Sequence, residues 1–214
     1  MNKSSIIDRL LHPGIVAIIR ADSSGQLLHA AQALYDGGVT AMEVTMTTPN
    51  ALQVIQEVSA HFGDKVLIGV GSVLDTETGR AALLAGAQFV VSPITKPELI
   101  SMSNRYGKPI ISGAYTPTEA LTAYEMGADF IKIFPADQLG PQYIKNILAP
   151  MPQLPIIPTG GVNVSTVEAF IKAGCVALGA GSSLVGKDVL KNQDWKKLSE
   201  TAAAFVEAIK KARA

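Results

Sequence analysis

The run Phe130-Ile131-Lys132-Ile133-Phe134-Pro135 predicts a short, buried β-strand with one lysine at its centre. Side chains alternate along a strand, so the lysine shares one face with the two phenylalanines, and the two isoleucines take the other face. A strand that is apolar on both faces is typical of a parallel sheet covered by helices. Burying an unpaired ammonium is costly, and a lysine that desolvation holds partly neutral is a nucleophile towards carbonyl groups. From this run alone, a catalytic role for Lys132 and a structural role, as an ion pair or as a side chain that reaches the strand end, are equally well supported.

Apolar runs of this kind recur along the chain, and each is followed by a segment with helical spacing. Glycines at the helix ends, as in Asp36-Gly37-Gly38 and Ala85-Gly86-Ala87, turn the chain back into the next strand. The expected strands are 15–20, 41–46, 66–72, 89–93, 109–113, 130–135, 155–160 and 176–181, and the expected helices are 23–35, 51–61, 76–84, 97–106, 117–126, 141–148, 164–173 and 194–212.

This alternation predicts an α/β protein, a single (β/α)8 TIM barrel over residues 1–214 with an extra N-terminal helix over residues 1–11 across one end. A doubly wound open sheet is the alternative fold. It is less favoured because no Gly-x-Gly-x-x-Gly turn follows the first strand. The sequence contains no linker or low-complexity tract that would mark a second domain.

The composition limits the classes of partner. The 18 basic and 18 acidic residues give a formal net charge of zero, so no basic field favours nucleic acid or an anionic membrane surface. No apolar run approaches the roughly 20 residues of a membrane span, and the charged N-terminal helix is unlike a signal peptide. Cys175 is the single cysteine, which excludes an internal disulfide and favours a buried thiol in a reducing compartment. We therefore expect a cytoplasmic protein that binds a small molecule.

The mouth of the predicted barrel brings polar residues together, because active sites of this fold lie at the C-terminal ends of the strands. Glu43 alternates with methionines that face the helices, so it points inward with Thr45 and Thr47. Lys132 points inward from the sixth strand. The two side chains form either an ion pair or a catalytic pair, in which Glu43 moves protons while Lys132 forms a Schiff base with a carbonyl substrate. Their positions at the functional end of a barrel slightly favour catalysis.

Two glycine-rich loops follow the seventh and eighth strands, where barrels of this kind commonly bind phosphate. They are Pro158-Thr159-Gly160-Gly161-Val162-Asn163 and Gly179-Ala180-Gly181-Ser182-Ser183. Glycine before a helix start lets backbone N–H groups approach an anion, although it also permits the positive φ of a tight turn. Because two such loops occupy the two expected places, we predict a phosphate site there.

Two further strand-end residues are candidates for holding a substrate carboxylate. Arg20 ends the first strand and offers a bidentate guanidinium fork, and Ser72 ends the third strand and offers a hydroxyl. Each is equally well explained as an ordinary polar residue at a strand end.

The histidines do not converge on the barrel mouth. His12, His29 and His61 fall in or beside predicted helices, so the sequence supplies no ligand set for a transition metal. Magnesium held by Glu43 and water molecules stays open.

Five motifs carry a resemblance to a known family. They are Glu43-Val44-Thr45-Met46-Thr47-Thr48-Pro49, Gly69-Val70-Gly71-Ser72-Val73-Leu74, Ser92-Pro93, Lys132-Ile133-Phe134-Pro135-Ala136 and Pro158-Thr159-Gly160-Gly161-Val162. Each motif alone is weak, but in this order they are jointly specific and span nearly the whole chain. On these residues the sequence resembles the 2-keto-3-deoxy-6-phosphogluconate (KDPG) and 4-hydroxy-2-oxoglutarate (KHG) aldolase family.

The resemblance implies a class I lyase, a metal-free homotrimer of (β/α)8 barrels that needs no cofactor. Such enzymes cleave a phosphorylated keto-deoxy sugar acid, KDPG in the Entner–Doudoroff pathway, into pyruvate and glyceraldehyde 3-phosphate. By the same resemblance Lys132 is the Schiff-base lysine and Glu43 the proton shuttle. It also implies a substrate pocket formed by Ser72, Pro93, Phe134 and Thr159, and a phosphate site formed by Gly160, Gly161, Gly181 and Ser182.

The sequence departs from the family pattern at the substrate site. Many members carry an arginine that binds the substrate carboxylate where Thr47 stands, so we expect Thr47 to line the site and Arg20 to replace the missing contact. Ser72 stands where threonine is usual and keeps the hydroxyl. The run 140–145 is also similar to the branch that acts on the galactonate epimer, and some relatives cleave KHG, which has no phosphate.

Two other classes of function stay open from the sequence. One is a phosphate-binding barrel of another kind, such as an isomerase or a thiazole- or pyrimidine-phosphate enzyme. It would share the glycine loops but would not need an inward lysine in the sixth strand. The other is a non-catalytic sugar-phosphate-binding protein, which would bind the substrate without releasing pyruvate.

Overall fold

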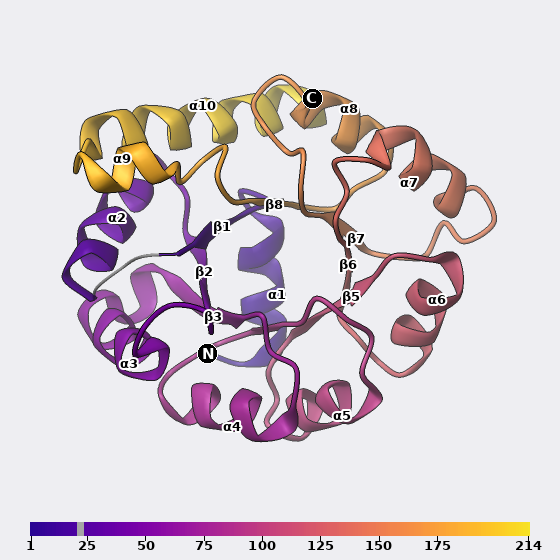
Figure 1. The fold of residues 1–214 in the computed structure, drawn as a ribbon. Coiled ribbons are helices and arrows are strands. Elements are labelled where there is room, and N and C mark those ends of the chain that lie inside the picture. The colour runs from indigo at the N-terminus through magenta and orange to yellow at the C-terminus, as the bar shows by residue number, and fades with distance from the viewer. Residues whose placement is uncertain (21–23) are drawn as a thin grey trace.

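The computed structural model describes residues 1–20 and 24–214, and in these residues eight parallel strands form a nearly closed barrel inside a ring of helices (Figure 1). The strands are β1 (Ile15–Ile19), β2 (Ala41–Thr45), β3 (Leu67–Gly71), β4 (Val90–Val91), β5 (Ile110–Ala114), β6 (Phe130–Ile133), β7 (Ile156–Pro158) and β8 (Leu178–Ala180). They pair in the order β7-β6-β5-β4-β3-β2-β1-β8, and a bridge between Thr159 and Gly179 joins the two ends of the sheet. The predicted (β/α)8 barrel is therefore confirmed.

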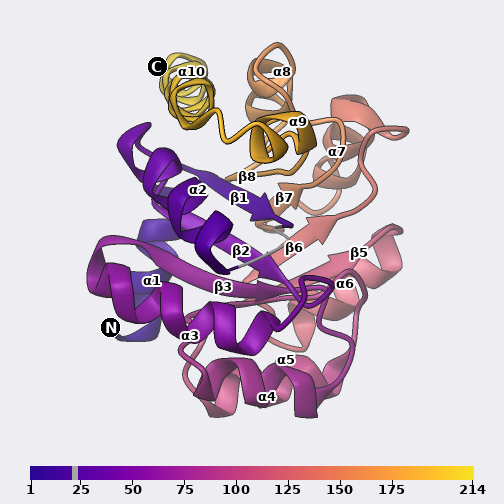
Figure 2. The same ribbon diagram turned by 60° about the vertical axis from the view of Figure 1, so that its left-hand side comes forward.

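The helices cover the outer face of the sheet, except α1, which crosses the end of the barrel where the strands begin (Figure 2). Their bounds are α1 (Lys3–Leu11), α2 (Ser24–Asp36), α3 (Ala51–Phe62), α4 (Thr76–Leu84), α5 (Pro97–Arg105), α6 (Pro117–Glu125), α7 (Gly140–Leu148), α8 (Val167–Lys172), α9 (Lys187–Lys191) and α10 (Trp195–Arg213), with a 3-10 turn at Gly63–Lys65. Within the described residues, no helix is long and apolar enough to cross a membrane.

Five elements differ clearly from the sequence-based expectation, and two of them, β7 and β8, have three residues each instead of six. β4 has two residues instead of the expected five, and Pro93, the last residue of the expected strand, has no N–H to donate to the sheet. α8 begins three residues later than residue 164, because Asn163 Oδ1 accepts hydrogen bonds from the backbone of Ser165 and Thr166 and holds them in a turn. α9 was not expected. The expected helix start at residue 23 lies outside the described residues.

The strands present two apolar faces, as the alternation predicts. The outer face packs on the helices and includes both isoleucines of β6, Ile131 and Ile133. The inner face begins with an apolar plug, in which Phe89 and Phe130 pack against Ile6 and Leu10 of α1. The end of the barrel where the strands begin is thus filled, and polar inward residues are left to the opposite end.

Candidate active site

The C-terminal ends of β1, β6, β7 and β8 border a cavity of about 290 Å³ at the barrel mouth. Most of the residues that were predicted to bind substrate or phosphate line this cavity, namely Arg20, Phe134, Thr159, Gly160, Gly161, Gly181 and Ser182. Five further lining residues were not predicted to bind substrate: Ile18, Val162, Asn163, Gly179 and Ser183.

Lys132 lies inside the barrel beneath this mouth. Only 6% of the residue is exposed, and its Nζ lies 4.9 Å from the centre of the Phe134 ring, a cation–π distance. In the described part of the chain it makes no ion pair and no side-chain hydrogen bond. The structural ion pair that the sequence left open is therefore not found there, and Lys132 lies below the residues that line the cavity.

Glu43 enters the same interior from β2. It is 3% exposed, and its carboxylate lies beside Gly71 of β3. Like Lys132, it forms no ion pair with any described residue. The barrel interior thus contains one buried carboxylate from β2 and one buried amine from β6, strands that are not neighbours in the sheet. They form no ion pair with each other.

The remaining predicted substrate residues lie outside the lining of this cavity. Thr47 is exposed beyond the end of β2, where its hydroxyl shares a hydrogen bond of 2.9 Å with that of Thr45. Ser72 follows β3 with φ at +60°, a strained conformation for a residue other than glycine, and Pro93 follows β4. Thr47, Ser72 and Pro93 therefore belong to the β2–β4 side of the mouth, opposite the two glycine loops.

Arg20 and the glycine loops form the polar part of the cavity. Gly160 and Gly161 have φ values of +97° and +69°, so the turn itself requires glycine at both positions. Gly181 lacks a positive φ, and a Cβ there would meet only Arg20, whose Nη1 would lie 3.9 Å away, and the Cβ of Ile18. The positive charge of Arg20 beside Gly181 is therefore the stronger sign of an anion site.

The sequence model of the KDPG and KHG aldolase family matches residues 6–201, most of the chain. The chain belongs to this family. Curated relatives of this family are aldolases, so the chain is a lyase.

Two curated relatives differ in the sugar acid that they are named for. A 2-dehydro-3-deoxy-6-phosphogalactonate aldolase of Escherichia coli (strain K12) is 36% identical over 92% of this chain and 95% of its own length. A 2-dehydro-3-deoxy-phosphogluconate aldolase of Pseudomonas aeruginosa is 32% identical over 96% of this chain and 94% of its own length.

One solved structure of a relative contains pyruvate. The KDPG aldolase from Legionella pneumophila, captured with pyruvate as a covalent carbinolamine intermediate, superposes on this chain with a TM-score of 0.85. It is 29% identical, and the match covers 92% of this chain and 96% of that one.

Sequence reasoning about this aldolase-family barrel missed the inward glycines that make room for the site. A Cβ at Gly113 of β5 would lie 2.1 Å from the carbonyl carbon of Pro93, and a Cβ at Gly179 of β8 would lie 2.3 Å from Oγ1 of Thr159. Glycine is disfavoured in strand interiors and marks a close approach of neighbouring atoms. That rule, applied to these inward positions, would have found both contacts.

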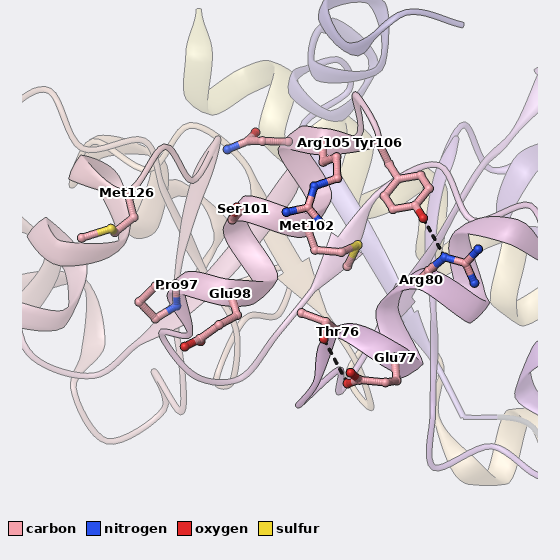
Figure 3. Close-up of a pocket in the computed structure, with 11 residues that line it drawn as sticks. Thr76, Glu77, Arg80, Pro97, Glu98, Ser101, Met102, Arg105, Tyr106 and Met126 are labelled. Carbon is pink, nitrogen blue, oxygen red and sulfur yellow. Dashed lines mark hydrogen bonds between the residues drawn. The ribbon is translucent and has the colours of Figure 1, made fainter.

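A second hollow lies on the outer wall of the barrel, between α4 and α5, and measures about 850 Å³ (Figure 3). Met102 lies between the two helices, and Arg80 Nε donates a 2.7 Å hydrogen bond to the hydroxyl of Tyr106. No predicted site residue lines this hollow. It is therefore separate from the aldolase site.

The three histidines and the cysteine do not line the cavity at the mouth. His12 ends α1, and His29 and His61 lie in α2 and α3. No group of three possible metal-ligating side chains gathers in the residues that the structure describes. Cys175 is buried, and burial raises the pKa of its thiol to about 12.

Proposed function

We propose that this protein is a class I aldolase that cleaves KDPG into pyruvate and glyceraldehyde 3-phosphate through a Schiff base at Lys132. The observation that carries the proposal is Lys132, a buried lysine without an ion pair in the described chain, beneath a mouth that holds Arg20 and two glycine loops. The carbinolamine in the Legionella pneumophila relative supports the same chemistry.

The reaction begins when the neutral amine of Lys132 attacks the C2 keto carbon to form a carbinolamine, which loses water to give an iminium ion. The iminium ion draws electrons from the C3–C4 bond, which breaks as a base removes the proton of the C4 hydroxyl. Glyceraldehyde 3-phosphate leaves, and the pyruvate enamine is protonated at C3 and hydrolysed. Glu43, through a water molecule, removes and returns these protons.

The substrate lies with its keto acid over Lys132 and its phosphate at Gly160, Gly161, Gly181 and Ser182. Ser72 and Pro93, with Phe134, surround the pyruvate half. The position of Arg20 beside Gly181 supports a contact with the phosphate, although the sequence led us to expect it at the carboxylate.

Borohydride trapping tests the Schiff base. Reduction in the presence of pyruvate should leave a covalent adduct on the wild type and none on Lys132→Ala. Lys96→Ala is a matched control, because the ammonium of Lys96 lies near the same end of the barrel, where it donates to the Leu74 carbonyl at 3.0 Å. It should keep the adduct. An unmodified wild-type enzyme would exclude the proposed mechanism and leave a phosphate-binding barrel of another class or a non-catalytic binding protein.

The proton shuttle has its own test. Glu43→Gln should fold normally and lose about a hundredfold to ten-thousandfold in kcat, the usual contribution of general acid–base catalysis. A kcat equal to that of the wild type would remove Glu43 from the mechanism.

A second candidate substrate is 2-keto-3-deoxy-6-phosphogalactonate, the C4 epimer, which gives the same two products. It is favoured by the higher identity to the galactonate-named relative, 36% against 32%. Measuring kcat/KM for both epimers and for KHG decides among them. If kcat/KM is largest for KDPG, the result would also support a place in the Entner–Doudoroff pathway.

We further propose that the enzyme is a cytoplasmic homotrimer whose copies meet at the outer wall around α4–α6. Of the ten large apolar residues that are exposed in the described chain, seven lie between residues 74 and 126. Two of them, Tyr106 and Met126, line the same hollow and are 38% and 52% exposed, and apolar residues gathered on one face mark interaction surfaces. The hollow between α4 and α5, called the groove below, is also lined by four charged residues that have no ion-pair partner in the described chain: Glu77, Arg80, Glu98 and Arg105 (Figure 3).

Sedimentation velocity tests the assembly. The wild type should sediment at three times the chain mass, and Met126→Glu should dissociate it because Met126 is 52% exposed beside the groove. Leu52→Glu, on α3, is the control and should leave the mass unchanged. A monomeric wild type would contradict the proposal.

A further inference from the structure

The inner face of β3 is bare above Leu67. Its next two inward residues are Gly69 and Gly71, and side chains from the neighbouring strands cover both of them. A Cβ at Gly69 would lie 2.3 Å from the ring of Phe89, which precedes β4. Eight strands cannot all fill one layer of a barrel interior, and layers are built by alternate strands. Beyond Leu67, β3 therefore places no side chain in the barrel interior, and the side chains of its neighbours fill that space.

Gly71 makes room for a different kind of neighbour. A Cβ at this position would lie 1.7 Å from Oε1 of Glu43, 2.3 Å from its Cδ and 2.5 Å from its Cγ. Glu43 is in register with Gly69, and its side chain leans along the strand direction so that the carboxylate lies over Gly71, nearer the mouth. The space left by the missing side chain is occupied by the carboxylate itself.

We propose that Gly71 is a positioning residue for Glu43. Because Gly71 has no side chain, the Glu43 carboxylate can lie directly against the backbone of β3, and this contact fixes its position. This proposal rests on the proposed aldolase function, in which Glu43 moves protons. A methyl group at residue 71 turns the Glu43 side chain away from that surface. The three atoms nearest to this methyl group all belong to the Glu43 side chain and none to the backbone. We therefore expect rotation about the side-chain bonds of Glu43 to relieve the overlap while the backbone stays in place.

The two glycines of β3 allow a matched comparison. Gly69→Ala places its methyl group against a rigid ring of the apolar plug, so it should lower the melting temperature and leave kcat per folded molecule near that of the wild type. Gly71→Ala should do the reverse. We expect its kcat to fall at least about tenfold with little change in KM or melting temperature, because a displaced general base loses its contribution.

Pyruvate separates the two halves of the reaction. Borohydride trapping of pyruvate on Lys132 should reach the same final yield in Gly71→Ala as in the wild type. The exchange of pyruvate methyl protons with deuterated solvent, which requires the proton shuttle, should slow by about the same factor as kcat.

A double-mutant cycle with Glu43→Asp decides the proposal. The shorter side chain withdraws from the methyl group, so the kcat of the double variant Gly71→Ala/Glu43→Asp should be no lower than that of the lower single variant. Additive losses would overturn the positioning role, and so would a kcat loss of the same size in Gly69→Ala. If Gly71→Ala fails to fold, the double variant should fold, and its failure would equally overturn the proposal.

The same experiments distinguish this proposal from the proposed function. A wild type that forms no borohydride adduct and releases no pyruvate would refute the aldolase mechanism itself. A wild type that forms the adduct, together with additive losses in the cycle, would refute only the role of Gly71.

Discussion

Glu43 and Lys132 are the two charged side chains that the described part of the chain buries. Removing charges from water is costly unless each is paired, and neither forms an ion pair in the residues described; Lys132 contacts only the ring of Phe134. Two buried charges without ion pairs do not stabilise the fold, so stability alone does not explain them. Buried charges without an ion-pair partner are a feature of functional sites, so the two side chains are best explained by a substrate that contacts them.

Arg20 provides a prediction at the scale of the single residue. Arg20→Met should raise KM for the phosphorylated substrate by about tenfold or more, because a hydrogen bond to a charged group contributes ~1.5–3 kcal/mol. If Arg20 binds the phosphate, the pyruvate concentration that gives half-maximal borohydride trapping should not change. A higher half-maximal concentration would instead place Arg20 at the carboxylate. Lys145→Met, which removes an exposed positive charge on α7, is the control and should change neither quantity.

At the scale of the element, α6 begins with a complete capping box. Thr116 accepts a hydrogen bond from the backbone of Glu119, and the Glu119 carboxylate accepts hydrogen bonds of 2.9 Å and 2.8 Å from the backbone N–H groups of Tyr115 and Thr116. The bond from Tyr115, followed by those from Thr116, lowers the pKa of Glu119 below its usual value. The start of this helix is therefore tied to a carboxylate charge.

This link gives α6 a predictable dependence on pH. A carboxylate whose pKa is lower in the folded state stabilises the fold above its unfolded value of about 4.5, and the stabilisation is lost as the pH falls through the folded-state value. Glu119→Gln should therefore lower the melting temperature by about 1–3 °C at pH 7 and by less near pH 3. Glu125→Gln, at the other end of α6, should show no such loss. Thermal denaturation across pH checks both, and an equal difference at every pH would contradict the charge-based explanation.

At the scale of the whole molecule, the two ends of the chain close the barrel together. Arg213, at the end of α10, donates hydrogen bonds of 2.9 Å to the carbonyl of Leu11, 3.3 Å to that of Pro13 and 2.6 Å to that of Val176. Its guanidinium lies against Gly14, where a Cβ would be 2.2 Å from Nη2. The last helix thus binds the segments that lead into β1 and β8.

Removing this contact should affect stability and not catalysis. Arg213→Met should lower the free energy of unfolding by about 1.5–3 kcal/mol, because three carbonyls lose a charged donor. The kcat of the folded enzyme should stay near that of the wild type, since the site lies at the opposite end of the strands. Lys211→Met is the control, because its ion pair with Glu207 is exposed and contributes little. Urea denaturation with parallel assays measures both effects, and a loss of kcat would contradict this separation.

The sequence by itself determined the repeating part of the fold. Apolar alternation within each strand and glycine at the helix ends are local patterns, so the eight βα units and the inward direction of the strand face that carries Lys132 could be deduced from neighbouring residues. The same reasoning placed the two glycine loops at one end of the barrel. Their positions follow from chain order once the fold is known.

Only the tertiary structure decided how residues from different strands meet. Strand register and the closure of the sheet decide three features: Glu43 and Lys132 form no ion pair among the residues described, the carboxylate lies over Gly71, and Arg20 lies beside Gly181. Periodicity fixes which face a side chain takes, but not its distance to a strand that lies far away in sequence. That distance is set by packing inside the barrel, where each inward side chain occupies space that its neighbour must leave free.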